Sequence, residues 1–239
     1  MLILGIDTSG RQGSVALLRA QGEEVVRLGL ATISGGQYSE GLVPGIAELL
    51  AGNGFARSAI GLIAVASGPG SFTGLRIAIA TAKGLAEAHA TPVVDVSVLE
   101  AIALASGGQG KVIAAMDAQR SEIFFGEYVV EGTGPEQSAK MLREGLAGFA
   151  DFTSLLDSGE APQQKIFTPD EGLAVRLREA ERDAVLIGRP SAEDFARIGY
   201  GKFLAGVRAD VATLDANYLR RSDAELFSPA KPGTEPAWH

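Results

Sequence analysis

Residues 2–10 read Leu-Ile-Leu-Gly-Ile-Asp-Thr-Ser-Gly, and this stretch decides the fold. Its first five residues are apolar and predict a buried strand. Asp7, Ser9 and Gly10 predict a turn directly after that strand, because Asp and Ser bond to their own backbone and Gly accepts a positive φ. The apolar residues 14–18 then predict a second strand. The opening of the chain therefore indicates a strand, an aspartate turn and another strand in immediate succession.

The same order returns in the second half of the chain. Residues 112–116 are apolar and end at Asp117, and a further strand is expected at 122–130. Residues 106–110, Ser-Gly-Gly-Gln-Gly, are the best linker candidate between the two halves. The repeat predicts an α/β protein of two related lobes. We expect these lobes to be 1–106 and 110–190.

Helices and strands alternate through the first lobe. Apolar spacing predicts strands at 25–32, 62–66 and 93–96, and helices at 39–52, 75–89 and 98–105. Ser39 is a candidate N-cap for the first of these helices. Pro44 lies inside the same helix, beyond the first turn where proline is easily tolerated.

The second half is predicted less completely, because the pattern from 131 to 183 is weak. Helices are expected near 151–157 and 171–182, a strand at 184–187 and a helix at 191–206. We expect the last helix to pack back onto the first lobe. The Pro- and Gly-rich tail, 228–239, is expected to be flexible.

Composition excludes several classes of protein. The chain has 239 residues, of which 46% are apolar and 21% charged, as in a globular protein with a real core. Its net charge of −8 cannot supply the basic surface that dominates nucleic-acid affinity, so it is a poor stand-alone RNA or DNA binder. The N-terminus lacks the basic segment of a signal peptide, and the apolar stretches are too short to span a membrane. A cytoplasmic protein is expected.

The inventory of reactive side chains is small. There is no cysteine, which excludes disulfides and thiolate sites, and there are only two histidines, His89 and His239. No pair of histidines has metal-ligand spacing, and no Ser–His–Asp set is evident. We therefore expect neither a metal site nor a catalytic residue in this chain.

A glycine-rich loop at 67–76, Ser-Gly-Pro-Gly-Ser-Phe-Thr-Gly-Leu-Arg, joins a predicted strand to a predicted helix. Its free backbone N–H groups and the dipole of the helix suit an anion, although no lysine of a Walker A loop is present. The simpler interpretation is a capped turn between strand and helix, with Ser71 or Thr73 as the cap. The glycines lie at Gly68, Gly70 and Gly74.

Small residues also mark the two longest predicted helices. Gly74, Ala78, Ala82 and Ala86 recur every four residues, which permits close approach of another backbone. We expect the helices at 39–52 and 75–88 to form a two-helix face that pairs with a second copy or with another subunit. The other residues assigned to this interface are Leu42, Gly45, Ile46 and Leu49. Ordinary packing within the lobe is the alternative; an aspartate at Ile46 or Ala82 would then unfold the chain.

Two aspartates are candidates for binding a cofactor. Asp7, with Thr8 and Ser9, and Asp117 each end an apolar strand, where a carboxylate can hold a metal or a phosphate-bound water. An aspartate at a strand end more often bonds to the backbone of its own turn.

The sequence resembles the TsaB (YeaZ) family over nearly its whole length. The resemblance is carried by the opening strand with Asp7-Thr8-Ser9, by 68–77 in the glycine loop, by 116–124 (Met-Asp-Ala-Gln-Arg-Ser-Glu-Ile-Phe) and by 217–220 (Asn-Tyr-Leu-Arg). It implies the two-lobed fold shared with actin and sugar kinases, each lobe a mixed sheet flanked by helices.

The resemblance also implies a function. Proteins of this family are non-catalytic scaffolds in making threonylcarbamoyladenosine on the adenosine beside the anticodon of tRNAs that read codons starting with A. They pair with a catalytic TsaD-like subunit and allow a TsaE-like ATPase to dock, so tRNA is met only through the complex, and a homodimer is expected in isolation. No intrinsic cofactor is implied; ATP is expected to bind weakly or at a partner interface.

Two departures from the family pattern bear on this function. Tyr38 stands where relatives often carry a histidine, and residues 187–190 read Ile-Gly-Arg-Pro without the acidic and small residues typical of that stretch. The alternative function is a stand-alone enzyme of the same fold, either a nucleotide-binding ATPase or kinase, or a peptidase. ATP hydrolysis by the purified chain distinguishes the two.

Overall fold

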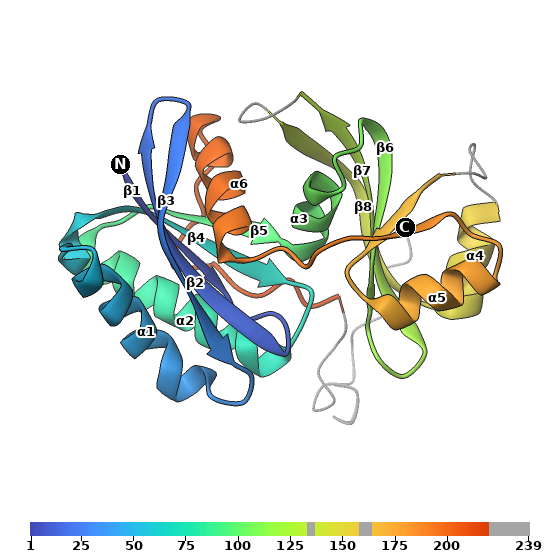
Figure 1. Cartoon of the computed structure of the whole chain (residues 1–239), viewed down its shortest axis with the longest axis horizontal. Coiled ribbons are helices and arrows are strands. Elements are labelled where there is room, and N and C mark those ends of the chain that lie inside the picture. The colour runs from blue at the N-terminus through green and yellow to red at the C-terminus, as the bar shows by residue number, and fades with distance from the viewer. Residues whose placement is uncertain (133–136, 158–163, 220–239) are drawn as a thin grey trace, which may run out of the picture.

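A computed structural model describes residues 1–132, 137–157 and 164–219. Its strands form two separate five-stranded sheets, one from each half of the chain (Figure 1). The predicted tail at 228–239 lies outside the described residues.

The first sheet has the order β3-β2-β1-β4-β5. Strands β1, β2 and β3 are antiparallel neighbours, whereas β4 runs parallel to β1 and β5 runs parallel to β4. The strands are β1 (Leu2–Asp7), β2 (Gln12–Gln21), β3 (Glu24–Ser34), β4 (Ile60–Gly68) and β5 (Val93–Ser97). Helices α1 (Tyr38–Gly52) and α2 (Phe72–His89) lie side by side on one face, and α6 (Ala192–Leu204) packs on the other (Figure 1). A short 3-10 helix, Arg57–Ala59, precedes β4.

The second sheet repeats this plan with the order β10-β9-β6-β7-β8. It opens with an antiparallel pair whose two strands are again joined by an aspartate turn, and β9 lies parallel to β6. The strands are β6 (Gly110–Asp117), β7 (Glu122–Glu131), β8 (Ser138–Gly148), β9 (Ile166–Thr168) and β10 (Ala184–Leu186). Helix α3 (Val98–Ala105) covers one face, and α4 (Phe149–Asp157) and α5 (Glu171–Glu179) cover the other.

Three apolar clusters hold this arrangement together. One lies between the first sheet and α1 and α2, and another between the second sheet, α4 and α5. The third is shared by both lobes, because α3 and α6 lie between the two sheets; it joins Leu62 and Val94 of the first sheet to Tyr128 of the second, around Phe195 of α6. The two lobes therefore share a continuous apolar core.

Several element boundaries differ from those predicted. The N-cap of α1 is Gln37 rather than Ser39, since the helix already begins at Tyr38, whose side chain is buried. Helix α2 begins at Phe72, three residues earlier than expected, because Ser71 is its N-cap. Strands β8 and β9 lie in the stretch whose pattern was too weak for strands to be predicted.

After α6 the described chain continues along the surface of the first lobe. We name residues 207–219 the strap. The backbone N–H of Ala209 donates to the carbonyl of Val93 at 2.9 Å, and that of Asn217 donates to the carbonyl of Ser67 at 2.7 Å. Leu214 of the strap is buried in the cluster beneath α2. The strap therefore belongs to the folded structure of the first lobe.

Candidate functional site

The turn after β1 is a buried polar cluster. Asp7 is only 2% exposed, and its Oδ1 accepts hydrogen bonds from the backbone N–H of Ser9 at 2.9 Å and from the Ser9 hydroxyl at 2.6 Å. Burial raises the pKa of Asp7, and the bonds from Ser9 and the charge of Arg189 oppose that rise. The Asp7 carboxylate thus bonds to its own turn, the more common role of an aspartate at a strand end.

Arg189 and Tyr38 enclose this turn from outside. The guanidinium of Arg189 donates to the Ser9 hydroxyl at 3.3 Å and lies across Gly10, where an added Cβ would come within 2.8 Å of it. The hydroxyl of Tyr38 donates to the carbonyl of Gly10 at 2.7 Å. Both residues stand at the departures from the family pattern, and both are used here to hold the Asp7 turn in place.

The glycine loop packs directly against the same turn. A Cβ at Gly74 would lie 1.9 Å from the carbonyl oxygen of Thr8, and one at Gly70 would lie 2.4 Å from that of Ser9. The loop is also bonded there, since Ser71 N–H donates to Ser9 O at 2.7 Å and the Thr8 hydroxyl donates to Gly74 O at 2.6 Å. These glycines are small so that two backbones can touch.

Helix α2 is capped at its N-terminus by the side chain of Ser71, the residue directly before it. The Ser71 hydroxyl accepts from the Gly74 N–H at 3.3 Å, which makes Ser71 the cap and not Thr73. Gly68, at the start of the loop, has a φ of 115° and would place a Cβ 3.0 Å from the carbonyl of Asn217 in the strap. Of the two interpretations of this loop, a capped turn fits the geometry better than an anion site.

Asp117, the counterpart of Asp7 in the second lobe, is exposed. Its carboxylate accepts from the backbone N–H of Gln119 at 2.8 Å and from the Gln119 side-chain amide at 2.9 Å. Its own N–H donates to Asp170 at 2.8 Å. The two aspartates therefore repeat the same local turn but lie in different environments, one buried and one in solvent.

The interface residues predicted from small-residue spacing lie on the inner sides of α1 and α2. Ala78, Ala82 and Ala86 are buried against the first sheet, and Gly74 is buried against the Asp7 turn. Leu42 and Ile46 of α1 belong to the same cluster. Gly45 and Leu49 face β3: a Cβ at Gly45 would lie 3.9 Å from Ile33, and the Leu49 side chain covers Gly29. This burial fits ordinary packing within the lobe, because close helix–sheet packing produces the same small-residue pattern as an interface. The assignment of these residues to a partner interface stays a prediction.

The outer sides of the same two helices carry a different set of uncharged residues, several of them small. Val43 is 50% exposed, Ala80 and Gly84 are exposed, and Ala47 and Ile77 are half-buried. Helical spacing places these residues opposite the buried ones. We name this set, with Thr73 and Thr81, the outer face. Sequence reasoning missed it, although the helical positions complementary to the buried stripe would have identified it.

An aromatic and cationic cluster borders the outer face at the start of α2. The Arg76 guanidinium lies 4.0 Å from the ring centre of Phe72 and donates from Nε to the Tyr218 hydroxyl at 2.9 Å. The rings of Phe72 and Tyr218 are 5.1 Å apart. Phe72 remains 38% exposed. The strap thus supplies one of the three side chains in this cluster.

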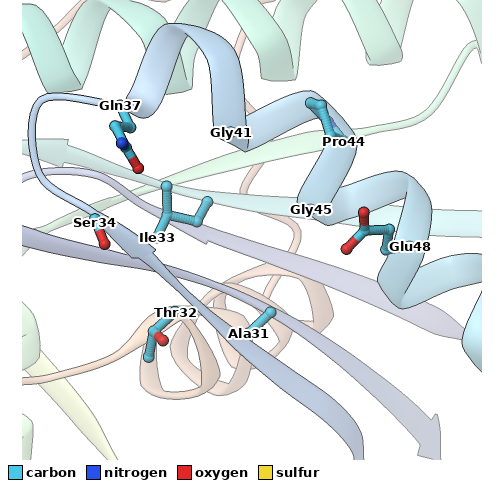
Figure 2. A pocket seen from close by; sticks show the side chains of 9 residues that line it. All are labelled: Ala31, Thr32, Ile33, Ser34, Gln37, Gly41, Pro44, Gly45 and Glu48. Atoms are coloured by element: carbon cyan, nitrogen blue, oxygen red, sulfur yellow. The ribbon is translucent and has the colours of Figure 1, made fainter.

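A groove of about 320 Å³ lies between helix α1 and strand β3. Figure 2 shows that Gly41 and Gly45 leave this flank of the helix open, with Ile33 at the floor and Gln37 and Glu48 at the ends. The groove is separate from the Asp7 turn.

In the described part of the chain, no helix is both long and apolar enough to cross a membrane.

These features define a class of protein. Two mixed sheets, each opened by an antiparallel pair around an aspartate turn and flanked by helices on both faces, form the two-lobed fold of the actin and sugar-kinase type. The fold class inferred from the sequence is therefore confirmed.

Comparisons with known proteins identify the family within this class. Residues 32–195 match the family described as "TsaD: tRNA N6-adenosine threonylcarbamoyltransferase". The chain is 30% identical over 237 residues to the tRNA threonylcarbamoyladenosine biosynthesis protein TsaB of Bacillus subtilis, covering 94% of this chain and 96% of that protein. TsaB of Haemophilus influenzae is 35% identical over 135 residues, which is 55% of each chain. The structure of YeaZ from Pseudomonas aeruginosa matches with a TM-score of 0.70 at 25% identity, covering 91% of this chain and 100% of that one.

The chain therefore belongs to the TsaB (YeaZ) family of tRNA threonylcarbamoyladenosine biosynthesis proteins, as its sequence motifs indicated.

Proposed function

We propose that this chain is the non-catalytic scaffold subunit of the complex that installs the threonylcarbamoyl group on the adenosine next to the anticodon of tRNAs reading codons starting with A. In that complex it pairs with a TsaD-like catalytic subunit and allows a TsaE-like ATPase to dock. The complex acts in the cytoplasm, and tRNA reaches this chain only through it, since a net charge of −8 disfavours direct binding.

The outer face of α1 and α2 is the observation that carries this proposal. Val43, Ala47, Ile77, Ala80 and Gly84 form a surface with little side-chain bulk, which allows helices of another subunit to approach closely. Depletion of charge is typical of the centre of an interface. Because residues 32–195 of this chain match the TsaD family model, a TsaD-like partner would have a related fold, and two such helix pairs could meet as a four-helix arrangement. The same face would form the homodimer of the isolated chain, in competition with the partner.

We further propose that the chain holds no nucleotide of its own. The atoms that would face a phosphate or a metal are already used within the protein: Asp7 accepts from Ser9, Ser71 caps α2, and Gly70 and Gly74 lie against backbone carbonyls. Any ATP needed by the complex binds to a partner or at a partner interface.

Reconstitution tests this function directly. The chain, a TsaD-like subunit and a TsaE-like ATPase from one organism are purified separately and mixed with unmodified tRNA and the activated threonylcarbamoyl donor. We expect repeated turnover to threonylcarbamoyladenosine only when this chain is present, with no ATP hydrolysis by the chain alone. Full modification without the chain would overturn the proposal. Product formation or ATP hydrolysis by the chain alone would show that it is an enzyme.

A further inference from the structure

The strap, residues 207–219, is held along the first lobe by the burial of Leu214 and Ala216 and by a small number of polar contacts. Near its start, the N–H of Ala209 donates to the carbonyl of Val93 at 2.9 Å. In its middle, the ammonium of Lys83 on α2 donates to the carbonyls of Ala212 at 3.2 Å and Leu214 at 2.8 Å. The strap forms no helix and no sheet ladder, so each of these contacts constrains a long piece of backbone.

Near the end of the strap, Asn217 makes contacts in two directions. Its backbone N–H donates to the carbonyl of Ser67 at the end of β4, at 2.7 Å. Its side-chain amide donates to Oε2 of Glu144 on β8, at 2.7 Å. Asn217 therefore links the glycine loop of the first lobe to the sheet of the second.

Glu144 is the point where the other segments converge. Its Oε1 accepts hydrogen bonds from the hydroxyl of Ser97 at 2.5 Å and from the hydroxyl of Tyr128. Ser97 also caps α3 through Leu99 N–H. One half-buried carboxylate thus joins the β5–α3 connection, strands β7 and β8, and the strap.

The hydrogen bonds to this carboxylate come from neutral donors. Burial and the charge of Glu144 raise the pKa of Tyr128, so its hydroxyl remains protonated and donates. The nearby ammonium of Lys202 is bonded to Glu100 at 2.9 Å. Hydrogen bonds from neutral donors to an ionised acceptor are stronger than those between neutral groups, but each depends on the correct donor facing the carboxylate.

We propose that Glu144 and Asn217 form a latch that fixes the strap against both lobes. When the latch is closed, the Asn217 amide bonds to Glu144, and the strap lies against α2 at Lys83. When the latch is broken, the end of the strap loses its bond to the second lobe and keeps the backbone bond from Asn217 to Ser67, the half-buried Tyr218 and the buried side chains of Leu214 and Ala216. The segment 214–219 then opens more often while the two sheets remain folded.

The latch has a consequence for pairing, which rests on the proposed function. Tyr218 follows Asn217 directly and completes the cluster with Phe72 and Arg76 beside the outer face. A closed latch therefore sets the position of an aromatic side chain at the edge of the surface offered to the TsaD-like subunit. Tyrosine and arginine are among the residue types that most often carry binding energy in interfaces.

Reversing the donor and acceptor tests the latch. N217D places a second carboxylate against Glu144 and opens the latch, whereas E144Q combined with N217D restores an amide and a carboxylate in exchanged positions. Hydrogen exchange of the strap amides of Leu214 and Asn217 is measured in each full-length variant, with Thr213→Asp as a control that adds the same charge to the strap away from Glu144.

We expect N217D to speed exchange of these amides at least tenfold, with amides of β1 and β6 unchanged, and the double variant to return to within about threefold of the parent. N217A, which removes the amide without adding a charge, should give a smaller increase in the same residues. Unchanged strap exchange in N217A, or a double variant no better protected than N217D, overturns the latch.

Affinity for the TsaD-like subunit is measured on the same samples. If the parent chain does not bind that subunit at all, the proposed function fails, while the exchange data still decide on the latch. If the parent binds and N217D opens the strap without weakening binding, the latch stands and its link to pairing fails.

Discussion

Both sides of helix α2 carry small residues, but one side is buried in the lobe and the other is exposed. The inner side, with Gly74 and Ala82, lies against the first sheet and the Asp7 turn, so closely that a Cβ at Gly74 would lie 1.9 Å from the carbonyl oxygen of Thr8. The outer side, with Ala80 and Gly84, is exposed, and a Cβ at Gly84 would meet nothing within 4 Å. Small residues in a helix therefore indicate close approach of another backbone only when the structure shows which side that backbone occupies.

The largest effect that separates the two sides is expected from Gly74→Ala. The added methyl would overlap the carbonyl of Thr8, so either α2 or the Asp7 turn must move. We predict a loss of at least about 4 kcal/mol in the free energy of unfolding, at the extreme of single substitutions. Urea denaturation followed by circular dichroism measures it. An ordinary single substitution lowers the free energy of unfolding by about 1 kcal/mol. A Gly74→Ala protein that loses no more than this would contradict the described packing.

Charge placed on the inner side is expected to be nearly as damaging. Ala82→Asp and Ile46→Asp each bury a carboxylate without a partner, which costs about 3–5 kcal/mol. Both variants are predicted to be unfolded or strongly destabilised, so loss of pairing in them would say nothing about an interface. Circular dichroism and thermal melting decide this. Cooperative melting of Ala82→Asp at the parent temperature would place this residue outside the core.

A smaller effect is expected at Asp7, which begins the turn against which the inner side of α2 packs. Because burial raises the pKa of Asp7 in the folded protein, the folded state keeps its proton at pH values where the unfolded chain has released it. Stability contributed by this group therefore falls as pH rises above 3.8, the ordinary value. Asp7→Asn keeps an acceptor for Ser9 and removes the titration.

We predict that Asp7→Asn is more stable than the parent at neutral pH by about 1 kcal/mol, and that this advantage disappears below the ordinary carboxyl pKa. Urea denaturation across the acid range measures the difference. An advantage that instead grows toward low pH would mean that the ionised carboxylate stabilises the fold.

The smallest effect is expected from Gly84→Ala on the outer side. Alanine has a higher helix propensity than glycine and the site has open space, so the isolated chain should gain up to about 1 kcal/mol. Thermal melting beside Gly74→Ala gives a matched pair of identical substitutions in one helix. A destabilised Gly84→Ala chain would show that its outer side is packed in the free protein.

Local chemistry made part of this structure predictable. The Asp7 turn was predicted from residues adjacent in sequence, and its repeat at Asp117 indicated two lobes. Strand β8 was missed because its exposed half includes Met141 and Leu142, so apolar residues do not alternate with polar ones, and its register against β7 shifts at Glu127/Tyr128. Contacts between residues that are far apart in the sequence leave no local pattern from which they could be predicted.

The candidate site shows the same limit. That Gly74 rests on Thr8, or that Asn217 meets Glu144, depends on how the whole chain folds. Spacing identified the small-residue stripe of α2 correctly, but it could not tell packing against the protein's own sheet from packing against a partner. The burial of this stripe in the structure favours packing against the protein's own sheet.

Pairing of an outer-face variant tests the scaffold function most directly. Ala80→Arg places a long charged side chain at the centre of the outer face, and Val175→Arg, at an exposed position on α5, adds the same charge to the second lobe as a matched control. Sedimentation velocity of each with the TsaD-like subunit measures affinity, and circular dichroism confirms the fold. We predict that Ala80→Arg stays folded and loses at least tenfold in affinity, about 1.4 kcal/mol, while Val175→Arg pairs like the parent. A folded Ala80→Arg chain that pairs with the affinity of the parent would contradict the assignment of this face to the partner.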